Sequence, residues 1–151
     1  MKSLLIVYHS QSGTCARLAR AAWRGARLEA DIHVSLLRAW DAGTLDLANA
    51  AGLLLIGAEN SGALCGAMKD FLDRTFYPAI ARGLVLPYAL LISAGNDGRG
   101  ARQQAARVMR GYPFPPAAEP LILRGVWCSE HADACAELGQ AFAAGLAMGV
   151  F

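Results

Sequence analysis

Short, continuous apolar runs alternate along the chain with longer amphipathic stretches. A brief apolar run that ends in polar turn residues is typical of a strand buried on both faces. A stretch with apolar positions every three or four residues is typical of a helix with one buried face. The pattern predicts strands at residues 4–8, 32–37, 53–56, 88–93 and 121–123. It predicts helices at residues 14–24, 45–50, 63–80, about 101–110 and 129–148, the last of them capped by Ser129.

Strands that alternate with helices favour a parallel sheet with helices on both faces. The chain length fits one domain, and no repeat or linker interrupts the pattern, so we expect a single domain over residues 1–151. In such a sheet, ligands lie beyond the carboxyl ends of the strands. Three loops that leave those ends are rich in Gly, Ser, Asn or Thr: residues 10–14, 58–62 and 94–100.

The first of these loops carries the clearest chemistry. Ser10, Ser12 and Thr14 offer hydroxyl donors, and Gly13 lets the backbone bend so that several amides point at one spot. The helix that follows adds its free amino-terminal amides and the positive end of its dipole. This combination predicts a phosphate site; the alternative is a simple helix cap with spare hydroxyls. No Gly-Lys-Ser/Thr or Gly-x-Gly-x-x-Gly pattern is present, so nucleoside triphosphate hydrolysis and tight dinucleotide binding of the Rossmann type lack support.

Three motifs carry a family resemblance. Residues 8–15, Tyr-His-Ser-Gln-Ser-Gly-Thr-Cys, resemble the FMN phosphate loop of flavodoxin-like proteins. Residues 59–74 are similar to the second flavin loop and the following helix of NAD(P)H-dependent FMN reductases, and residues 94–100 take the place of their third loop. The resemblance implies a three-layer α/β flavodoxin-like fold, with a five-stranded parallel sheet in the order 2-1-3-4-5.

The same resemblance implies that FMN is held by the three loops. The cofactor-binding residues that it implies are Ser10, Gln11, Ser12, Gly13, Thr14, Cys15, Ala58, Glu59, Asn60, Ser61, Gly62, Ala94, Gly95, Asn96, Asp97 and Gly98. Two features depart from the family pattern. Cys15 stands where a hydroxyl residue is usual, and the second loop lacks the aromatic residues that pack on the flavin ring in relatives. For Glu59, Asn60 and Asp97, the alternative is that they make local turns.

The function implied by the resemblance is an FMN-dependent oxidoreductase. NAD(P)H would act as the transient reductant, and a quinone or similar small molecule would accept the electrons, with no side chain acting as a catalytic acid or base. Two alternatives remain: a flavodoxin-type electron carrier, and a non-catalytic flavodoxin-like protein with a degraded flavin site. The family also implies a homodimer or homotetramer.

Composition and net charge limit the classes of partner, the location and the metal content that we expect. A net charge of +2 gives no reason to expect nucleic acid as the main partner. We expect a cytoplasmic protein with no membrane segment, because no run resembles a signal peptide or a transmembrane helix. The four cysteines form no C-x-x-C pair and have no zinc spacing, so we expect reduced thiols and no metal; a redox pair of Cys15 and Cys65 is the alternative. The arginines of the fourth helix are interpreted as a solvated face.

Overall fold

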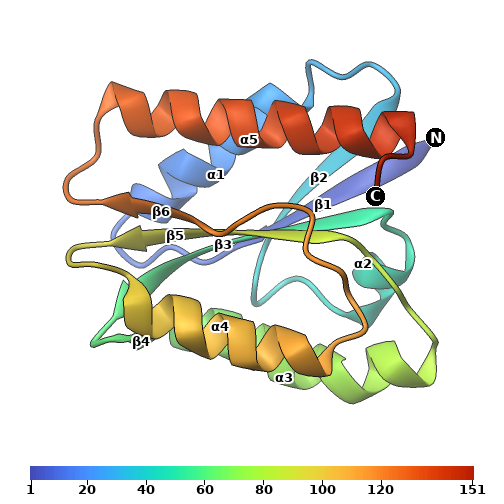
Figure 1. Cartoon of the computed structure of the whole chain (residues 1–151), viewed down its shortest axis with the longest axis horizontal. Coiled ribbons are helices and arrows are strands. Elements are labelled where there is room, and N and C mark those ends of the chain that lie inside the picture. Colours follow the sequence, from blue (N-terminus) through green and yellow to red (C-terminus); the bar gives the residue numbers. More distant parts are fainter.

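The computed structural model describes residues 1–151 and arranges them as one twisted sheet between two layers of helices (Figure 1). Five parallel strands lie in the order β2-β1-β3-β5-β6, and a short sixth strand pairs with β3 alone. The order and direction of the five parallel strands confirm the predicted arrangement. The strands are β1 (Lys2–Tyr8), β2 (Ile32–Arg38), β3 (Gly52–Asn60), β4 (Ala63–Leu64), β5 (Tyr88–Ala94) and β6 (Leu121–Arg124).

The helices divide between the two faces of the sheet. Figure 1 shows α1 and α5 on one face, and α3 and α4 on the other. Both chain termini lie at the end of the sheet opposite to the loops that leave the carboxyl ends of the strands. None of the helices has both the length and the apolar character required to cross a membrane. The helices are α1 (Thr14–Ala26), α2 (Thr44–Ala48), α3 (Gly66–Ala81), α4 (Arg99–Gly111) and α5 (Ser129–Met148).

The central strand β3 shows why its sequence is apolar at successive positions. Leu53 and Leu55 point into the core beneath α3 and α4, whereas Leu54 and Ile56 point into the core beneath α1 and α5. All four side chains are almost fully buried. Side chains alternate between the two faces of a strand, so a strand covered on both faces needs an apolar residue at each position.

Helices α1 and α5 approach each other through a pair of glycines. A β-carbon on Gly25 would lie 2.0 Å from the carbonyl oxygen of Ala136, and one on Gly139 would lie 2.1 Å from the carbonyl oxygen of Ala22. Each glycine therefore packs directly against the backbone of the other helix. We call this contact the glycine seam. It fixes how α1 and α5 lie relative to each other, because no larger residue fits at either position.

Three expectations about local structure were wrong. Residues 57–60 were expected to begin a loop, but they continue β3, and residues 63–64 form β4 rather than the start of the next helix. Pairing with β5 and with β4 stabilises this extension, and a composition of Gly, Ala, Glu and Asn does not signal it. Ser129 does not cap α5: it is the first helical residue, the cap position belongs to Cys128, and no side chain caps that end.

Candidate functional site

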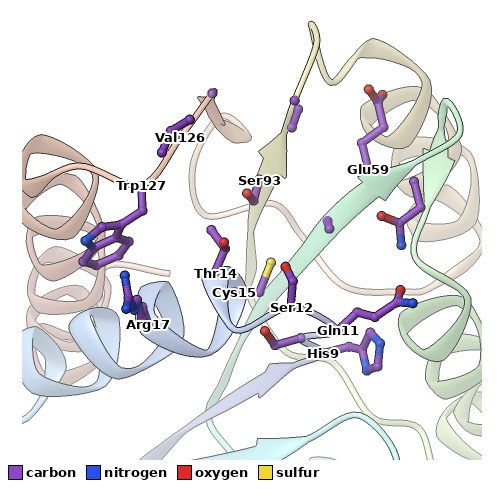
Figure 2. A pocket seen from close by; sticks show the side chains of 16 residues that line it. His9, Gln11, Ser12, Thr14, Cys15, Arg17, Glu59, Ser93, Val126 and Trp127 are labelled. Carbon is purple, nitrogen blue, oxygen red and sulfur yellow. The ribbon is translucent and has the colours of Figure 1, made fainter.

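A cavity of about 690 Å³ lies at the carboxyl edge of the sheet, where the predicted loops meet (Figure 2). This size is within the usual range for a site that holds a small molecule or cofactor. The cavity walls come from loops of all three predicted segments. The expected residues that line it are Ser10, Gln11, Ser12, Thr14, Cys15, Ala58, Glu59, Asn60, Ala94 and Gly95.

The loop between β1 and α1, residues 9–13, and the first turn of α1 leave most of their hydrogen-bond donors free. Within it, the Gly13 amide donates to the Ser10 hydroxyl at 3.0 Å. The amides of residues 10–12 and 14–16 donate to no protein acceptor, and the hydroxyls of Ser12 and Thr14 have no protein partner either. Gly13 has φ of 105°, in the left-handed region that glycine adopts without strain, and no side chain caps α1. These donors surround a helix amino terminus, which is the arrangement that binds an anion.

The charged groups of the cavity lie at its two ends. Arg17, one turn into α1, is the cationic side chain among the lining residues, and it forms no ion pair. Glu59 is the lining carboxylate, and its Oε2 atom accepts a hydrogen bond from the Ala101 amide at 3.1 Å. Figure 2 shows Arg17 and Glu59 on opposite sides of the loop between β1 and α1. The cavity is therefore positive toward α1 and α5, and its negative group is engaged by α4.

The β3–β4 hairpin is closed by Ser61 and Gly62, which have φ of 50° and 75°. Two left-handed residues in a two-residue connection are typical of a hairpin turn of type I′. The hairpin rests on α4, because the Leu64 amide donates to the Gln104 Oε1 atom at 2.7 Å. A β-carbon on Gly100 would lie only 1.8 Å from the Gly62 carbonyl oxygen. Ser61 and Gly62 are therefore at the exposed tip of the hairpin and do not line the cavity.

In the third loop, only Ala94 and Gly95 line the cavity. Asn96, Asp97 and Gly98 lie outside its wall. The Asp97 carboxylate accepts a hydrogen bond from the Arg99 amide at 3.0 Å, so it forms a local turn at the start of α4. Gly98 has φ of 73°, and a β-carbon there would lie 2.7 Å from the Ile122 side chain. Gly13 likewise does not line the cavity, but it shapes the loop whose neighbours do.

Cys15 forms part of the cavity floor and is almost fully buried. Burial, and to a smaller extent the nearby Cys65, raise the pKa of its thiol from 9.0 to about 12, although a hydrogen bond with Ser93 opposes the shift. Burial likewise raises the pKa of Cys135 to about 12. Because a thiolate is the reactive form, these two thiols are unreactive near neutral pH. All four cysteines are free, and no three His, Cys, Asp or Glu side chains are placed to hold a metal ion.

The charged residues of α3 and α4 lie away from the cavity. The expected pairs on α3 are present: Lys69 with Asp73 at 2.8 Å and Arg74 with Asp70 at 2.7 Å. Arg74 also donates to the backbone carbonyls that precede α2, so it ties α3 to that segment. On α4, Arg102 approaches Glu119 at 3.3 Å on the surface. The α4 arginines do not line the cavity.

Several lining residues were not expected from the sequence: His9, Arg17, Ser93, Gly125, Val126 and Trp127. Trp127 follows β6, so the rule that ligands lie beyond the carboxyl ends of strands also applied to its loop. Arg17 carried no such signal, because helical periodicity places it on the outward face without showing that a cavity borders that face. His9 packs against Trp40, with ring centroids 5.0 Å apart.

The two halves of the cavity differ in aromatic content. The half between the hairpin and the third loop is lined by small or polar residues: Ala58, Glu59, Asn60, Ser93, Ala94 and Gly95. This agrees with the absence of aromatic residues noted in the sequence of the second loop. The other half carries Trp127, whose ring centroid lies 5.5 Å from the Arg17 guanidinium carbon.

No known family model matches this sequence, and no curated protein matches it. Solved structures do. A flavodoxin from the domain Archaea matches with a TM-score of 0.79 and 20% identity, over 95% of this chain and 98% of that one. A WrbA-like flavodoxin protein from Agrobacterium tumefaciens matches with a TM-score of 0.78 and 15% identity, over 98% of this chain and 99% of that one.

A larger protein, the rubredoxin oxygen:oxidoreductase of Desulfovibrio gigas, matches over 99% of this chain but only 37% of its own length, with a TM-score of 0.84 and 15% identity. At such identities the likeness establishes the fold and no more. The chain therefore has the flavodoxin-like fold that its loop motifs resemble.

Proposed function

We propose that this cavity binds FMN, and that the chain is an NAD(P)H-dependent oxidoreductase that passes hydride through the flavin to a quinone or similar small acceptor. The observation that carries the proposal is the set of unpaired amides around residues 10–16, which face a cofactor-sized cavity. The first amides of a helix have no partner within the helix, and a phosphate monoester supplies several acceptor oxygens at once.

The residues present fit FMN in a specific orientation. The phosphate is bound by the amides of residues 10–12 and 14–16 and by the hydroxyls of Ser12 and Thr14. The flavin ring would be held in the half of the cavity between the hairpin and the third loop, whose lining includes Asn60 and Gly95. When bound, the flavin supplies the hydride chemistry, accepting at N5 from NAD(P)H and passing electrons to the acceptor.

The small side chains at the ring end favour an enzyme that exchanges electrons with small molecules. Neither wall of that half carries an aromatic residue to cover the ring, so a nicotinamide or a quinone has space to stack there. The side chains position the cofactor, and no carboxylate or imidazole is required as an acid or base, because hydride transfer to a flavin needs none.

A flavodoxin-type electron carrier is the second candidate. The observation that favours it is the match to a flavodoxin over nearly the full length of both chains. A carrier needs the same phosphate loop but has no need to bind a nicotinamide. The two candidates therefore differ in whether NAD(P)H reduces the bound flavin.

The first experiment is a calorimetric titration of the purified chain with FMN and, separately, with riboflavin. We expect FMN to bind more tightly than riboflavin, because only FMN carries the phosphate. Equal affinities would contradict the phosphate site, and no binding of either flavin would overturn the proposed function. The second experiment adds NADH or NADPH without air to the FMN-loaded chain and follows the flavin absorbance. Bleaching, and recovery upon addition of a quinone, supports the enzyme; a flavin that neither nucleotide bleaches leaves the carrier.

A further inference from the structure

The cavity extends past the loop of residues 10–14 to a second half lined by Arg17, Val126 and Trp127. We propose that this half takes the adenosine phosphate part of a flavin dinucleotide, so that FAD binds along the whole cavity. The inference rests on the proposed flavin site. Figure 2 shows the arrangement: Ser12 and Thr14 lie in the middle, Glu59 lies to one side, and Arg17 and Trp127 lie to the other.

Trp127 offers part of its indole for a planar base, and the Arg17 guanidinium carbon, 5.5 Å from the ring centroid, turns aside to the phosphate when a base stacks there. Its loop leaves the carboxyl end of β6 through Gly125, which has φ of 82°, and then enters α5. The indole packs partly against the core beneath α1 and α5, while the residue stays half-exposed beside the cavity. A half-buried indole that lines a cavity is the kind of surface on which nucleobases stack.

Arg17 is placed for a second phosphate. It lies one helical turn beyond Thr14, whose amide belongs to the first phosphate site, and its guanidinium is exposed and free of any carboxylate. A planar guanidinium binds phosphate oxygens with two parallel hydrogen bonds. The pyrophosphate of a dinucleotide places its second phosphate next to the first, on the way from the loop to Trp127.

The first turn of α5 carries a carboxylate, Glu130. The pKa of Glu130 is lowered because its carboxylate accepts hydrogen bonds, first from its own backbone amide and then from Cys128 and Ser129. That carboxylate therefore interacts with the positive end of the α5 helix dipole. Arg17 is left as the cation that faces the second half of the cavity.

The same helix contains a matched pair for comparison. At the far end of α1, Arg27 lies over the ring of Trp23 at 4.5 Å, and the Trp23 indole donates to the Val34 carbonyl. This second arginine–tryptophan pair borders none of the cavity's walls. Arg27→Gln is therefore a control for Arg17→Gln, since both remove one exposed positive charge from the same helix beside a tryptophan.

The test is calorimetric titration of the full chain with FMN and with FAD, for the wild type, Trp127→Leu, Trp127→Phe, Arg17→Gln and Arg27→Gln. We expect FAD to bind the wild type about tenfold more tightly than FMN, a gain typical of one stacked base. Trp127→Leu removes this advantage and leaves FMN affinity unchanged, whereas Trp127→Phe retains most of it. Arg17→Gln reduces FAD affinity more than FMN affinity, and Arg27→Gln changes neither.

The outcomes separate the two proposals. If FMN binds and FAD binds no more tightly, the flavin site stands and the dinucleotide inference is wrong. If Trp127→Leu weakens FMN and FAD equally, with circular dichroism showing a native fold, the indole supports the site without stacking on a base, which also overturns the inference. If neither flavin binds the wild type, both proposals fail.

Discussion

The loop between β1 and α1 and the β3–β4 hairpin leave the same edge of the sheet, and both are rich in glycine and serine. They differ in what satisfies their polar groups. In the first loop, most amides and two hydroxyls have no protein partner. In the hairpin, the Glu59 carboxylate and the Leu64 amide are bonded to α4, and Gly62 rests against Gly100.

This difference distinguishes a loop with donors available for a ligand from a loop that only shapes the cavity. A loop whose donors are unmatched has them available for an external acceptor, because no bond within the protein must first be broken. A loop that already bonds to a neighbouring helix has little to offer a ligand beyond its shape. Glycine content alone does not distinguish the two, and the location of the acceptors does.

The largest effect is expected from a substitution that disrupts the contact between the hairpin and α4. Gly100→Ala places a methyl group on the Gly62 carbonyl oxygen, a backbone contact that no side-chain movement relieves. We expect the free energy of unfolding to fall by about 3 kcal/mol or more. Urea denaturation measures this. Gly43→Ala is the control, since Gly43 also lies at the start of a helix, as the N-cap of α2, but has an extended φ of −151° and open space around it. A loss no larger than in the control would show that the hairpin is not held against α4.

A substitution in the first loop should affect binding more than stability. Gly13→Ala meets no atom within 4 Å, so its effect comes from φ of 105° alone. We expect the free energy of unfolding to fall by about 1–2 kcal/mol, and FMN affinity to fall about tenfold or more as the amides turn away from the phosphate.

Calorimetry with FMN and urea denaturation measure these two effects on the same protein. Gly66→Ala serves as the control, because it also meets no atom within 4 Å and lies at the start of α3, away from the cavity. Gly13→Ala with unchanged FMN affinity would mean that the loop does not hold the phosphate.

A substitution of Glu59 tests whether the hairpin contributes to stability and not to FMN binding. Glu59→Ala removes the acceptor for the Ala101 amide at the start of α4, so we expect the unfolding free energy to fall by about 1 kcal/mol with FMN affinity unchanged. Glu119→Ala, which removes an exposed partner of Arg102, should have almost no effect in urea denaturation. A large loss of FMN affinity in Glu59→Ala would assign this carboxylate to the ligand.

The smallest effect concerns the thiols beneath the first loop and α1. The folded pKa values of Cys15 and Cys135, about 12, lie above the ordinary value of 9.0, because burial disfavours the thiolate. The folded state therefore keeps protons that the unfolded state releases. This contribution to stability is complete below about pH 9 and is lost as the pH rises toward about 12.

We expect the unfolding free energy to decline as the pH rises above about 9, and to decline less steeply in Cys135→Ala. Denaturant titrations across this range measure the slope. A thiol reagent near neutral pH should modify the half-buried Cys128 first and the buried cysteines slowly. Equal slopes in wild type and variant would show that Cys135 ionises as freely as an exposed thiol.

The sequence predicted the sheet well because burial on both faces leaves a direct mark, as in the run Leu53–Leu54–Leu55–Ile56. The sequence also indicated that the first loop is rich in hydrogen-bond donors, because those donors are consecutive in the chain. The hairpin escaped prediction since its stability depends on pairing with β5 and contacts with α4, which are distant in sequence. Arg17 escaped for a similar reason: its neighbour across the cavity, Trp127, is far away along the chain.

The glycine seam has a consequence for how this protein selects what it binds. The amino terminus of α1 carries the first loop, and the loop before α5 carries Trp127, so the span between these two walls depends on how the helices are aligned. Gly25 and Gly139 set that alignment, although neither borders the cavity. A family of related chains can therefore change ligand length without altering a single contact residue, by changing the two positions where its helices touch.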